Sequence, residues 1–567
     1  MSAVMTTTET KADELISFNP ATGEELGRVR FSTPEDVDEA VARSRVVFHK
    51  WKTTSFAERK RIVMKARDVI LAEMDEIAHL ISAESGKPFG EAIAMEIAPV
   101  LDLMQWVARG AKKMLRPRRV DIGSYRLFAR SSRIVYHPLG VVAIIPAWNY
   151  PFSIPLGEAA MSLMAGNSVV IKPSELTPLV GLKIGEIFEK AGAPVGLVQI
   201  VSGAGETGAA LVDAAPDKIM FTGSVATGKK IAAEAAKNLT SVVLELGGKD
   251  PMIVFEDANL EVAAGAAVWG AFCNSGQSCS SVERLYAHES IAEKLTQLIV
   301  EKTKHLKQGP GDSEDVSIGA LVSERQIRIV EQHVDAFRDA GARIETGGRR
   351  ADTPVRMSVA STRTGAGGTD ASAGDGGLAG GTGDADKSVR APLFYEPTVI
   401  SAAANDMLPM REETFGPTLP IATFRTDEEA IALANDTEFG LTASVWTRDR
   451  ARARRVAERI EAGTVCINEV LYTHGIGQTP WGGFKNSGRG RTHGIEGLME
   501  LVQPQHIHTN HLPLLPDPWW MPYSPLAVKT FRGFATKFAT GSLARISQLS
   551  PLLSKRIMEL IKLSKKK

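Results

Sequence analysis

The sequence predicts an α/β protein with more than one domain. Its 567 residues are too many for a single hydrophobic core, and its composition is that of a globular protein. Between residues 141 and 246, short apolar runs alternate with helical patterns. The runs are continuously apolar, as in parallel strands covered on both faces. A second region with strand and helix patterns extends to about Gln503.

Charge and cysteine content exclude several classes of protein. The 66 Lys and Arg residues balance 66 Asp and Glu residues, so no overall field draws the chain to nucleic acid. Three cysteines cannot all pair, and neither they nor the histidines have the spacing of metal ligands. We therefore expect no metal and a reduced, cytoplasmic setting. The start of the chain has no signal-peptide core, and prolines interrupt the most apolar stretch, 139–156, which cannot span a membrane.

The first 140 residues are predicted to pack rather than to catalyse. Residues 1–15 look disordered. Helices are expected after the capping residues Thr33 and Ser55, and a third over about 91–114. The alternating, arginine-rich segment at about 120–138 predicts an exposed hairpin that could serve as an oligomer contact.

Polar residues follow the predicted strands of the first sheet. These strands are expected at 141–146, 168–173, 198–201, 218–221 and 241–246. Asn149, Lys172, Ser224 and Glu245 lie at or just past the ends of four of them. Because parallel sheets bind ligands at the carboxyl ends of their strands, these residues predict a site at that edge.

Cys279 is the candidate nucleophile. It ends the stretch Asn-Ser-Gly-Gln-Ser-Cys at 274–279, which follows an apolar run at 262–269. There the sulfur can face a ligand while the residue's own N–H points at the group attacked. A lone cysteine is more often a small buried hydrophobe, and that is our interpretation of the other two. The presence of Glu245 and Asn149 at or just past predicted strand ends favours a nucleophile at this position.

Seven motifs in order resemble those of the aldehyde dehydrogenase superfamily. They are Pro-Ala-Trp-Asn-Tyr-Pro at 146–151, Lys-Pro-Ser-Glu at 172–175, Phe-Thr-Gly-Ser at 221–224, Glu-Leu-Gly-Gly-Lys at 245–249, Gly-Gln-Ser-Cys at 276–279, Glu-Glu-Thr-Phe-Gly-Pro at 412–417 and Pro-Trp-Gly-Gly-Phe-Lys-Asn-Ser-Gly at 480–488. The resemblance covers about Phe18 to His508. Each motif alone is weak, but seven in register are specific. The resemblance implies a Rossmann-like NAD-binding domain, an α/β catalytic domain and a small β oligomerisation element.

The same resemblance suggests a division of the chain. We expect an NAD-binding domain at 16–246, a catalytic domain at 247–480, and a return segment with an oligomerisation strand at 481–510. The predicted hairpin at 124–136 and strand at 501–509 suggest a homodimer or homotetramer. Residues 350–390, mostly Gly, Ala, Asp, Ser and Thr, are expected to be a disordered insertion because they offer little apolar surface to bury.

The extension 511–567 is basic and amphipathic. Such a helix can lie on an anionic membrane, here the inner face of the cell membrane, or dock on a partner subunit or on the body of the protein. The sequence leaves both possibilities open.

The resemblance implies oxidation of a small-molecule aldehyde at Cys279. Attack by the thiolate gives a thiohemiacetal whose oxyanion needs donors, which the Asn149 amide and the Cys279 N–H can supply. Loss of hydride to a nicotinamide leaves a thioester, and the resemblance gives Glu245 the role of activating water against it. Relatives that transfer the acyl group to coenzyme A lack this base, so Glu245 predicts the free acid as product. The alternatives are a Glu245–Lys249 ion pair and a turn role for Asn149.

Cofactor contacts are likewise implied by the resemblance. Ser224, in the turn before a helix N-terminus, is placed at the phosphates. Glu413 is placed at the nicotinamide ribose and Phe415 beside the ring, where the alternative is a core aromatic. The remaining positions carried over are Pro146, Trp148, Ser174, Gly205, Thr222, Gly223 and Leu246.

Lys172 and Glu175 are placed at the adenosine ribose, where the alternative is a solvated loop. A carboxylate accepts a hydrogen bond from a 2′-hydroxyl but repels a 2′-phosphate. Glu175 therefore predicts NAD in preference to NADP.

The sequence does not identify the aldehyde substrate. Succinic semialdehyde is one option because relatives with similar motifs use it, but it calls for an arginine that the sequence does not identify. A fatty or aromatic aldehyde suits a membrane-seeking tail better. A thiol esterase without net redox chemistry is a second interpretation of the same thiol and base, opposed by the dinucleotide-site residues.

Overall fold

The computed structural model describes residues 8–11, 14–351, 392–538 and 547–565. The insertion predicted at 350–390 lies outside the described residues from 352 on. The chain divides into two units. The large unit comprises 1–111 and 138–501, and the small unit comprises 112–137 and 502–567. The predicted boundary between cofactor and catalytic domains, near residue 246, stays a prediction.

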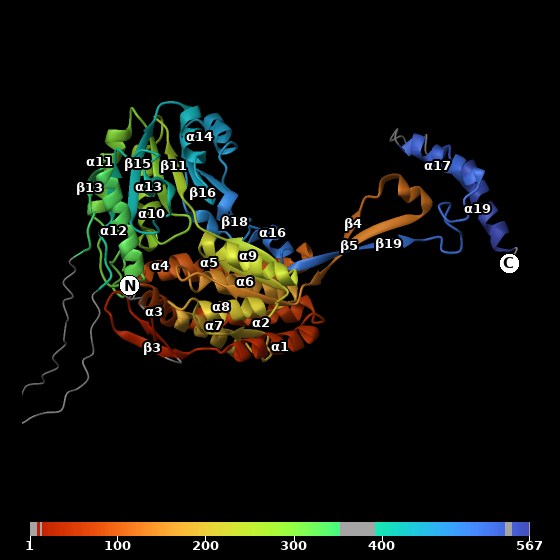
Figure 1. Ribbon diagram of the computed structural model, residues 1–567, viewed down its shortest axis with the longest axis horizontal. Coiled ribbons are helices and arrows are strands. Elements are labelled where there is room, and N and C mark those ends of the chain that lie inside the picture. The colour runs from red at the N-terminus through yellow and green to blue at the C-terminus, as the bar shows by residue number, and fades with distance from the viewer. Residues whose placement is uncertain (1–7, 12–13, 352–391, 539–546, 566–567) are drawn as a thin grey trace, which may run out of the picture. The chain divides into compact units, whose positions relative to one another are not determined.

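The first sheet of the large unit has the predicted parallel strands. They are β6 (Val141–Ile145), β7 (Ser168–Ile171), β8 (Val198–Ile200), β9 (Lys218–Thr222) and β10 (Ser241–Glu245), with β18 (Gly488–Arg489) antiparallel at one edge. Consecutive strands are joined by α6 (Ser153–Ala165), α7 (Pro178–Lys190), α8 (Gly205–Asp213) and α9 (Val225–Ala235) (Figure 1). The order is β18-β10-β9-β6-β7-β8, so the chain reverses direction across the sheet beside β6. Ligands bind at such a reversal in open α/β sheets.

The helices before this sheet begin where their caps predict. Thr33 forms a capping box with Asp36 at the start of α1 (Pro34–Trp51), and Ser55 caps α2 (Phe56–Ala72). α3 (Met74–Ser85) follows. The single helix predicted over 91–114 is instead α4 (Phe89–Glu91), a π-helical turn at Ala92–Ile97 and α5 (Ala98–Met114). A π turn inserts a residue into the helix and re-aims the side chains beside it.

The second sheet of the large unit has the order β13-β14-β15-β12-β11-β16-β17. The strands are β11 (Asp250–Val254), β12 (Val282–His288), β13 (Arg343–Thr346), β14 (Thr398–Ser401), β15 (Thr418–Phe424), β16 (Thr442–Trp446) and β17 (Thr464–Ile467). All pairs are parallel except β13 with β14.

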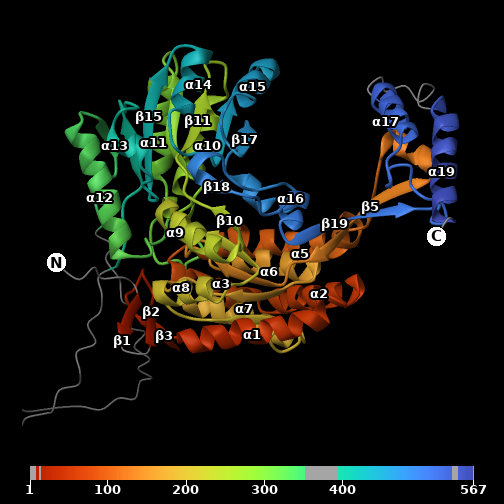
Figure 2. The ribbon, with the colours of Figure 1, turned by 45° about the vertical axis from the view of Figure 1, so that its right-hand side comes forward.

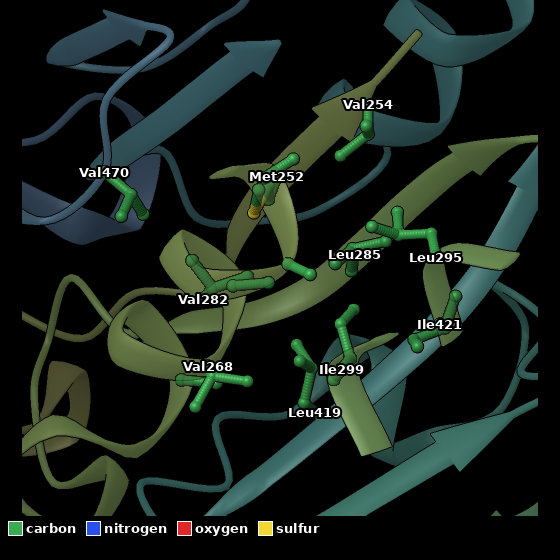
Figure 3. Packing of buried hydrophobic residues seen from close by; sticks show 14 of the residues in the cluster. Met252, Val254, Val268, Val282, Leu285, Leu295, Ile299, Leu419, Ile421 and Val470 are labelled. Atoms are coloured by element: carbon green, nitrogen blue, oxygen red, sulfur yellow. The ribbon is translucent and has the colours of Figure 1, made fainter. Parts of the chain in front are cut away.

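Alternation along these strands fills a core on each face of the second sheet. Met252, Val254 and Leu285 face one way and pack with α10 (Leu260–Phe272) and α11 (Ala292–Lys304) (Figure 3). The intervening Ile253 and Tyr286 face the other way. Helices α12 (Glu324–Asp339), α14 (Asp427–Asn435) and α15 (Arg450–Ala457) contribute to that second core. Two short helices complete the unit, α13 (Leu408–Arg411) and α16 (Gly494–Met499).

The predicted disorder of residues 1–15 is wrong for the part that the structure describes. β1 (Thr8–Lys11) pairs antiparallel with β2 (Glu14–Phe18), which pairs in turn with β3 (Glu25–Arg30). Leu15 is buried. The polar composition of β1 gave no signal for a strand, because its order depends on main-chain pairing with β2 rather than on burial of its own side chains.

The small unit joins two distant parts of the sequence. β4 (Arg118–Val120) and β5 (Arg130–Pro138) form the predicted hairpin, joined through a 3₁₀ turn at Gly123–Phe128, and β19 (Val502–Asn510) lies beside β5. α17 (Pro525–Phe538) and α19 (Ser550–Ser564) lie side by side in this unit (Figure 2). No helix within the described ranges is long and apolar enough to cross a membrane.

Candidate active site

The loop before Cys279 is held in a strained backbone conformation. Asn274 and Ser275 both have left-handed dihedrals, with φ of 52° and 54°. The Asn274 N–H donates to Glu91 Oε2 at 2.8 Å, and Ser275 Oγ donates to the carbonyl of Gly319 at 3.0 Å. Left-handed non-glycine residues persist only where surrounding contacts over-determine them. The fold therefore fixes this loop, and with it the approach of the chain to Cys279.

Asn149, the predicted oxyanion donor, lies against this loop. Its Nδ2 donates to the carbonyl of Gln277 at 3.1 Å, and its own carbonyl accepts from Asn274 Nδ2 at 3.0 Å. A primary amide has two N–H groups, so one is left for a ligand oxygen. The two contacts bring the loop after β6 to the residues just before Cys279. A local turn residue, the alternative for Asn149, would not require this long-range contact.

A buried ion pair supports Asn149 from behind. Lys87 donates to Glu96 at 2.5 Å and to the carbonyl of Asn149 at 2.8 Å, and both charged side chains are fully buried. Glu96 Oε2 also accepts the N–H groups of Phe152 and Ser153, both at 2.9 Å, where α6 begins. Glu96 lies in the π-helical turn. The sequence predicts only a packing role for this helix, but the Glu96 carboxylate anchors the segment that carries Asn149.

Glu245 ends β10 inside the large unit. Its side chain is buried, and neither carboxyl oxygen has a hydrogen-bond partner among the described residues. Burial and the nearby Glu158 carboxyl raise the pKa of Glu245 well above its usual range, and Arg491 acts in the opposite direction. Lys249 pairs with Glu283 instead, at 2.5 Å. The alternative of a Glu245–Lys249 ion pair is therefore wrong.

The turn after Glu245 reaches the backbone of Cys279. A Cβ on Gly248 would lie 2.2 Å from the Cys279 carbonyl oxygen, so the close approach needs glycine at 248. Cys279 itself is partly exposed. Burial raises the pKa of its thiol, and the carboxyls of Asp250, Glu413 and Glu245 raise it further. The low polarity and the carboxyls around the thiol thus favour its neutral form over the thiolate.

Glu413 contacts the Gly248 turn, and Phe415 contacts Trp148. Glu413 Oε1 accepts the Gly248 N–H at 2.9 Å, and burial raises the pKa of Glu413 to about 8. Phe415 is partly exposed, which excludes a fully buried core aromatic, and its ring lies edge-on to Trp148 with centroids 5.3 Å apart. The buried Glu283 carboxylate accepts the N–H groups of residues 414 and 415, both at 2.8 Å, and so fixes this segment.

Lys172 and Glu175 extend from the carboxyl end of β7. Lys172 Nζ donates to the carbonyl of Gly203 at 2.9 Å and to Glu175 at 3.4 Å. Burial lowers the pKa of Lys172, whereas Glu175 raises it. The Lys172 side chain is only 5% exposed and that of Glu175 is 45% exposed. A solvated loop is therefore wrong for Lys172, while Glu175 offers a carboxylate to solvent. Ser174 Oγ accepts the Leu176 N–H at 3.2 Å.

The turn at Gly223 ties two strand ends to a helix N-terminus. The Gly223 N–H donates to the Glu245 carbonyl at 3.0 Å, and Ser224 caps α9 by accepting the Thr227 N–H at 3.3 Å. Thr222 is the last residue of β9. Of the other predicted positions, Pro146 and Leu246 are buried and Gly205 begins α8 with open space at its Cβ position. These predicted cofactor residues, with Lys172 and Ser174, thus share the carboxyl edge of the first sheet, whereas Glu413 and Phe415 precede β15 of the second sheet.

A family model that matches most of the sequence decides the family. The aldehyde dehydrogenase family model matches residues 7–360 and 369–507. The chain belongs to the aldehyde dehydrogenase family. It is 37% identical over 520 residues to the 4,4'-diapolycopene aldehyde oxidase of Methylomonas, covering 92% of this chain and 90% of that protein. It is 36% identical over 500 residues to the betaine aldehyde dehydrogenase of Bacillus subtilis, covering 88% and 94%.

Solved aldehyde dehydrogenases share the fold. A putative aldehyde dehydrogenase of Burkholderia cenocepacia superposes with a TM-score of 0.79 at 32% identity, over 89% of this chain and 95% of that one. The betaine aldehyde dehydrogenase of Staphylococcus aureus, crystallised with NAD+, gives 0.78 at 32% identity, over 90% and 96%. The expected aldehyde dehydrogenase fold is therefore confirmed, and the family makes this chain an aldehyde oxidoreductase.

Several residues beside the predicted site were missed. Glu158 is a buried carboxyl whose pKa is raised to about 8 by burial, and it lies close enough to Glu245 to affect the pKa of that residue. The sequence did carry a signal, since Glu158 is the lone charge in the apolar helix α6. Within the part of the chain that the structure describes, no group of side chains could hold a metal ion.

The carboxyls around Cys279 make the reactivity of its thiol a measurable property. Glu413→Gln removes a charge that raises the thiol pKa, so at pH 8 the thiolate fraction should rise and iodoacetamide should react several-fold faster with Cys279. The measurement is the alkylation rate in the absence of cofactor, read by peptide mass. Glu412→Gln, which neutralises the preceding and mostly exposed carboxylate, is the matched control and should leave the rate unchanged. A slower reaction in Glu413→Gln would contradict this electrostatic account.

Proposed function

We propose that this aldehyde dehydrogenase oxidises an aldehyde to the free carboxylic acid with NAD, through a covalent intermediate on Cys279. The observation that supports this most is the contact of three separate segments at one point. The Asn149 amide lies on the loop before Cys279, and the Gly248 turn brings the segment after Glu245 against the Cys279 carbonyl. A nucleophile, an oxyanion donor and a buried carboxylate are what this reaction needs.

The proposed first step is attack on the aldehyde. The Cys279 thiol loses its proton to a base, and its sulfur forms a bond to the carbonyl carbon. The free N–H of Asn149 Nδ2 and the Cys279 N–H donate to the oxygen that becomes negative. NAD, when bound, supplies the acceptor for the hydrogen and the two electrons that leave this carbon. A thioester on Cys279 remains.

The proposed second step is hydrolysis. Glu245 takes a proton from water, the water oxygen bonds to the thioester carbon, and the carbon–sulfur bond breaks to return the thiol and release the acid. A carboxylate whose pKa is raised by burial is a stronger base than an exposed one once it is ionised. The absence of hydrogen-bond partners on both Glu245 oxygens, among the described residues, leaves them able to accept from water.

The residues at the sheet edge fit a dinucleotide. The first turn of α9 offers main-chain N–H groups beside the exposed Ser224 and the partly exposed Gly223, suited to phosphate. The Glu175 and Glu413 carboxylates can accept from ribose hydroxyls, and the partly exposed Phe415 can flank the nicotinamide. We assign contact roles also to Pro146, Trp148, Lys172, Ser174, Gly205, Thr222 and Leu246. Four of the similar solved structures contain NAD+.

The division of labour between Cys279 and Glu245 can be tested by transient kinetics. Glu245→Gln should form NADH in a burst of about one equivalent per site and then turn over roughly 10²–10⁴-fold more slowly, because the thioester forms but water is not activated. Cys279→Ala should give neither the burst nor turnover. Stopped-flow absorbance of NADH with a short aliphatic aldehyde measures both. Unchanged steady-state turnover in Cys279→Ala would end the proposal.

Glu175 should set the cofactor preference. Glu175→Gln removes the charge that repels a 2′-phosphate, so the ratio of kcat/KM for NADP to that for NAD should rise by about tenfold or more. Glu189→Gln neutralises an exposed carboxylate on α7 and is the matched control. An equal ratio in the wild type and Glu175→Gln would remove the argument from charge.

We also propose that the protein is a homodimer or homotetramer. β19 is an edge strand of its sheet, so its outer main-chain groups can pair with another copy. Light scattering after gel filtration at micromolar concentration measures the mass, and a monomer would contradict the proposal.

The aldehyde is left to experiment. The two similar curated proteins carry names with different aldehydes. A screen of NADH release across short, long-chain, aromatic and carboxylated aldehydes distinguishes the candidates, including succinic semialdehyde.

A further inference from the structure

The small unit is far more basic than the chain as a whole. It contains 18 Lys and Arg residues against three Asp and Glu residues, although the full sequence is balanced at 66 of each. All three acids are already paired within the unit: Asp121 with Arg126 at 3.2 Å, Asp517 with Arg130 at 2.6 Å, and Glu559 with Arg556 at 2.7 Å. The unit therefore carries a large surplus of positive charge. Exposed cations of this surplus include Lys529 and Arg532 on α17 and Lys555 and Lys562 on α19.

A segment of this unit presents apolar side chains to solvent. Leu514 is 94% exposed and Met521 is 74% exposed. Leu512, Leu515, Trp519, Trp520 and Tyr523 are also exposed. A run of large apolar side chains so close together marks an interaction site, because water contact with such a patch is unfavourable. The segment lies beyond residue 507, where the match to the family ends, so the aldehyde dehydrogenase fold does not account for it.

A buried arginine holds part of this segment in place. The Arg556 side chain is fully buried, and its guanidinium donates to the carbonyls of Pro518, Trp520 and Pro522 at 3.3, 2.6 and 2.7 Å. It also pairs with Glu559, which accepts from Ser524 Oγ at 3.0 Å. The main chain is thus bound inward while the side chains of residues 520, 521 and 523 stay exposed. The exposed apolar side chains therefore project from a main chain that hydrogen bonds to Arg556 hold in place.

We propose that the small unit binds the surface of an anionic phospholipid bilayer. Its surplus cations are attracted to anionic headgroups, Trp and Tyr rings favour the headgroup boundary, and Leu and Met side chains can enter the acyl layer. Nucleic acid would satisfy the cations but leave Leu514 and Met521 in water. Pairing of two copies through β19 would add a second set of cations and no anionic partner for them. Binding would be peripheral, since no helix among the described residues can span a membrane.

The test is flotation of the full-length protein with lipid vesicles. Wild type should float with vesicles containing one-third phosphatidylglycerol and not with phosphatidylcholine alone, and high salt should weaken binding. Trp520→Ser with Met521→Ser should lower the bound fraction about tenfold. The matched control is Val195→Ser with Leu239→Ser, which changes apolar residues of the large unit that are even more exposed than Trp520 and Met521. The proposal is independent of the proposed chemistry, because lipid binding is measured without aldehyde or NAD.

A second set of variants tests the contribution of positive charge to vesicle binding. Lys529→Glu, Lys555→Glu and Lys562→Glu together should abolish binding to anionic vesicles, whereas Lys60→Glu, Arg61→Glu and Lys65→Glu on α2 should not. Unchanged circular dichroism and oxidation of a water-soluble aldehyde would show that each variant is folded. Absence of wild-type flotation with anionic vesicles, or equal flotation of the small-unit and control variants, would overturn the proposal. So would binding to a DNA duplex without binding to vesicles, or a change in oligomeric mass as the sole effect of the small-unit variants.

Discussion

The close approach of the Gly248 turn to the Cys279 backbone is the constraint on which the site depends. The turn continues from β10, the last of the parallel strands of the first sheet, and Cys279 precedes a central strand of the second. Any side chain at 248 would collide with the Cys279 carbonyl. The same turn donates its N–H to Glu413, which links the segment beside Phe415 to both. One glycine therefore allows the candidate nucleophile, a buried carboxylate and a predicted cofactor ligand to meet.

The burial of several carboxyl groups is the main influence on the pKa values at this site. Glu158, Glu245, Asp250 and Glu413 all have pKa values raised, in each case chiefly by loss of water around the carboxyl. The thiol of Cys279 responds in the same direction. Because these groups interact and little solvent surrounds them, the protonation of one changes the pKa of the others. The protein thus keeps carboxyls that can exchange protons close to the thiol, which suits the proposed reaction, in which a proton leaves first the sulfur and later water.

Structural support for the site comes from charges that never touch a ligand in the proposed mechanism. Lys87 and Glu96 hold the segment of Asn149, and Lys249 and Glu283 hold the segment of Phe415. Each pair is buried. Lys87, Glu96 and Glu283 also hydrogen-bond main-chain groups, and Lys249 donates to Thr414 Oγ1. Breaking such a pair would leave a charge unpaired in a dry interior, which is costly. Arg556 uses the same device in the small unit, where the segment it fixes faces solvent instead.

The sequence by itself determined the sheet strands, the caps of the first helices and the candidate residues Cys279, Glu245 and Asn149, because apolar runs, capping residues and strand-end polar residues are local signals. Tertiary structure alone decided what these residues meet. The Lys87 contact with Asn149, the choice of Glu283 rather than Glu245 as the partner of Lys249, the pairing of β19 with β5 and the strand at residues 8–11 all join segments whose pairing local patterns do not specify. Desolvation likewise depends on every neighbour in space, so the raised pKa of Glu245 could not be read from the residues beside it in the chain.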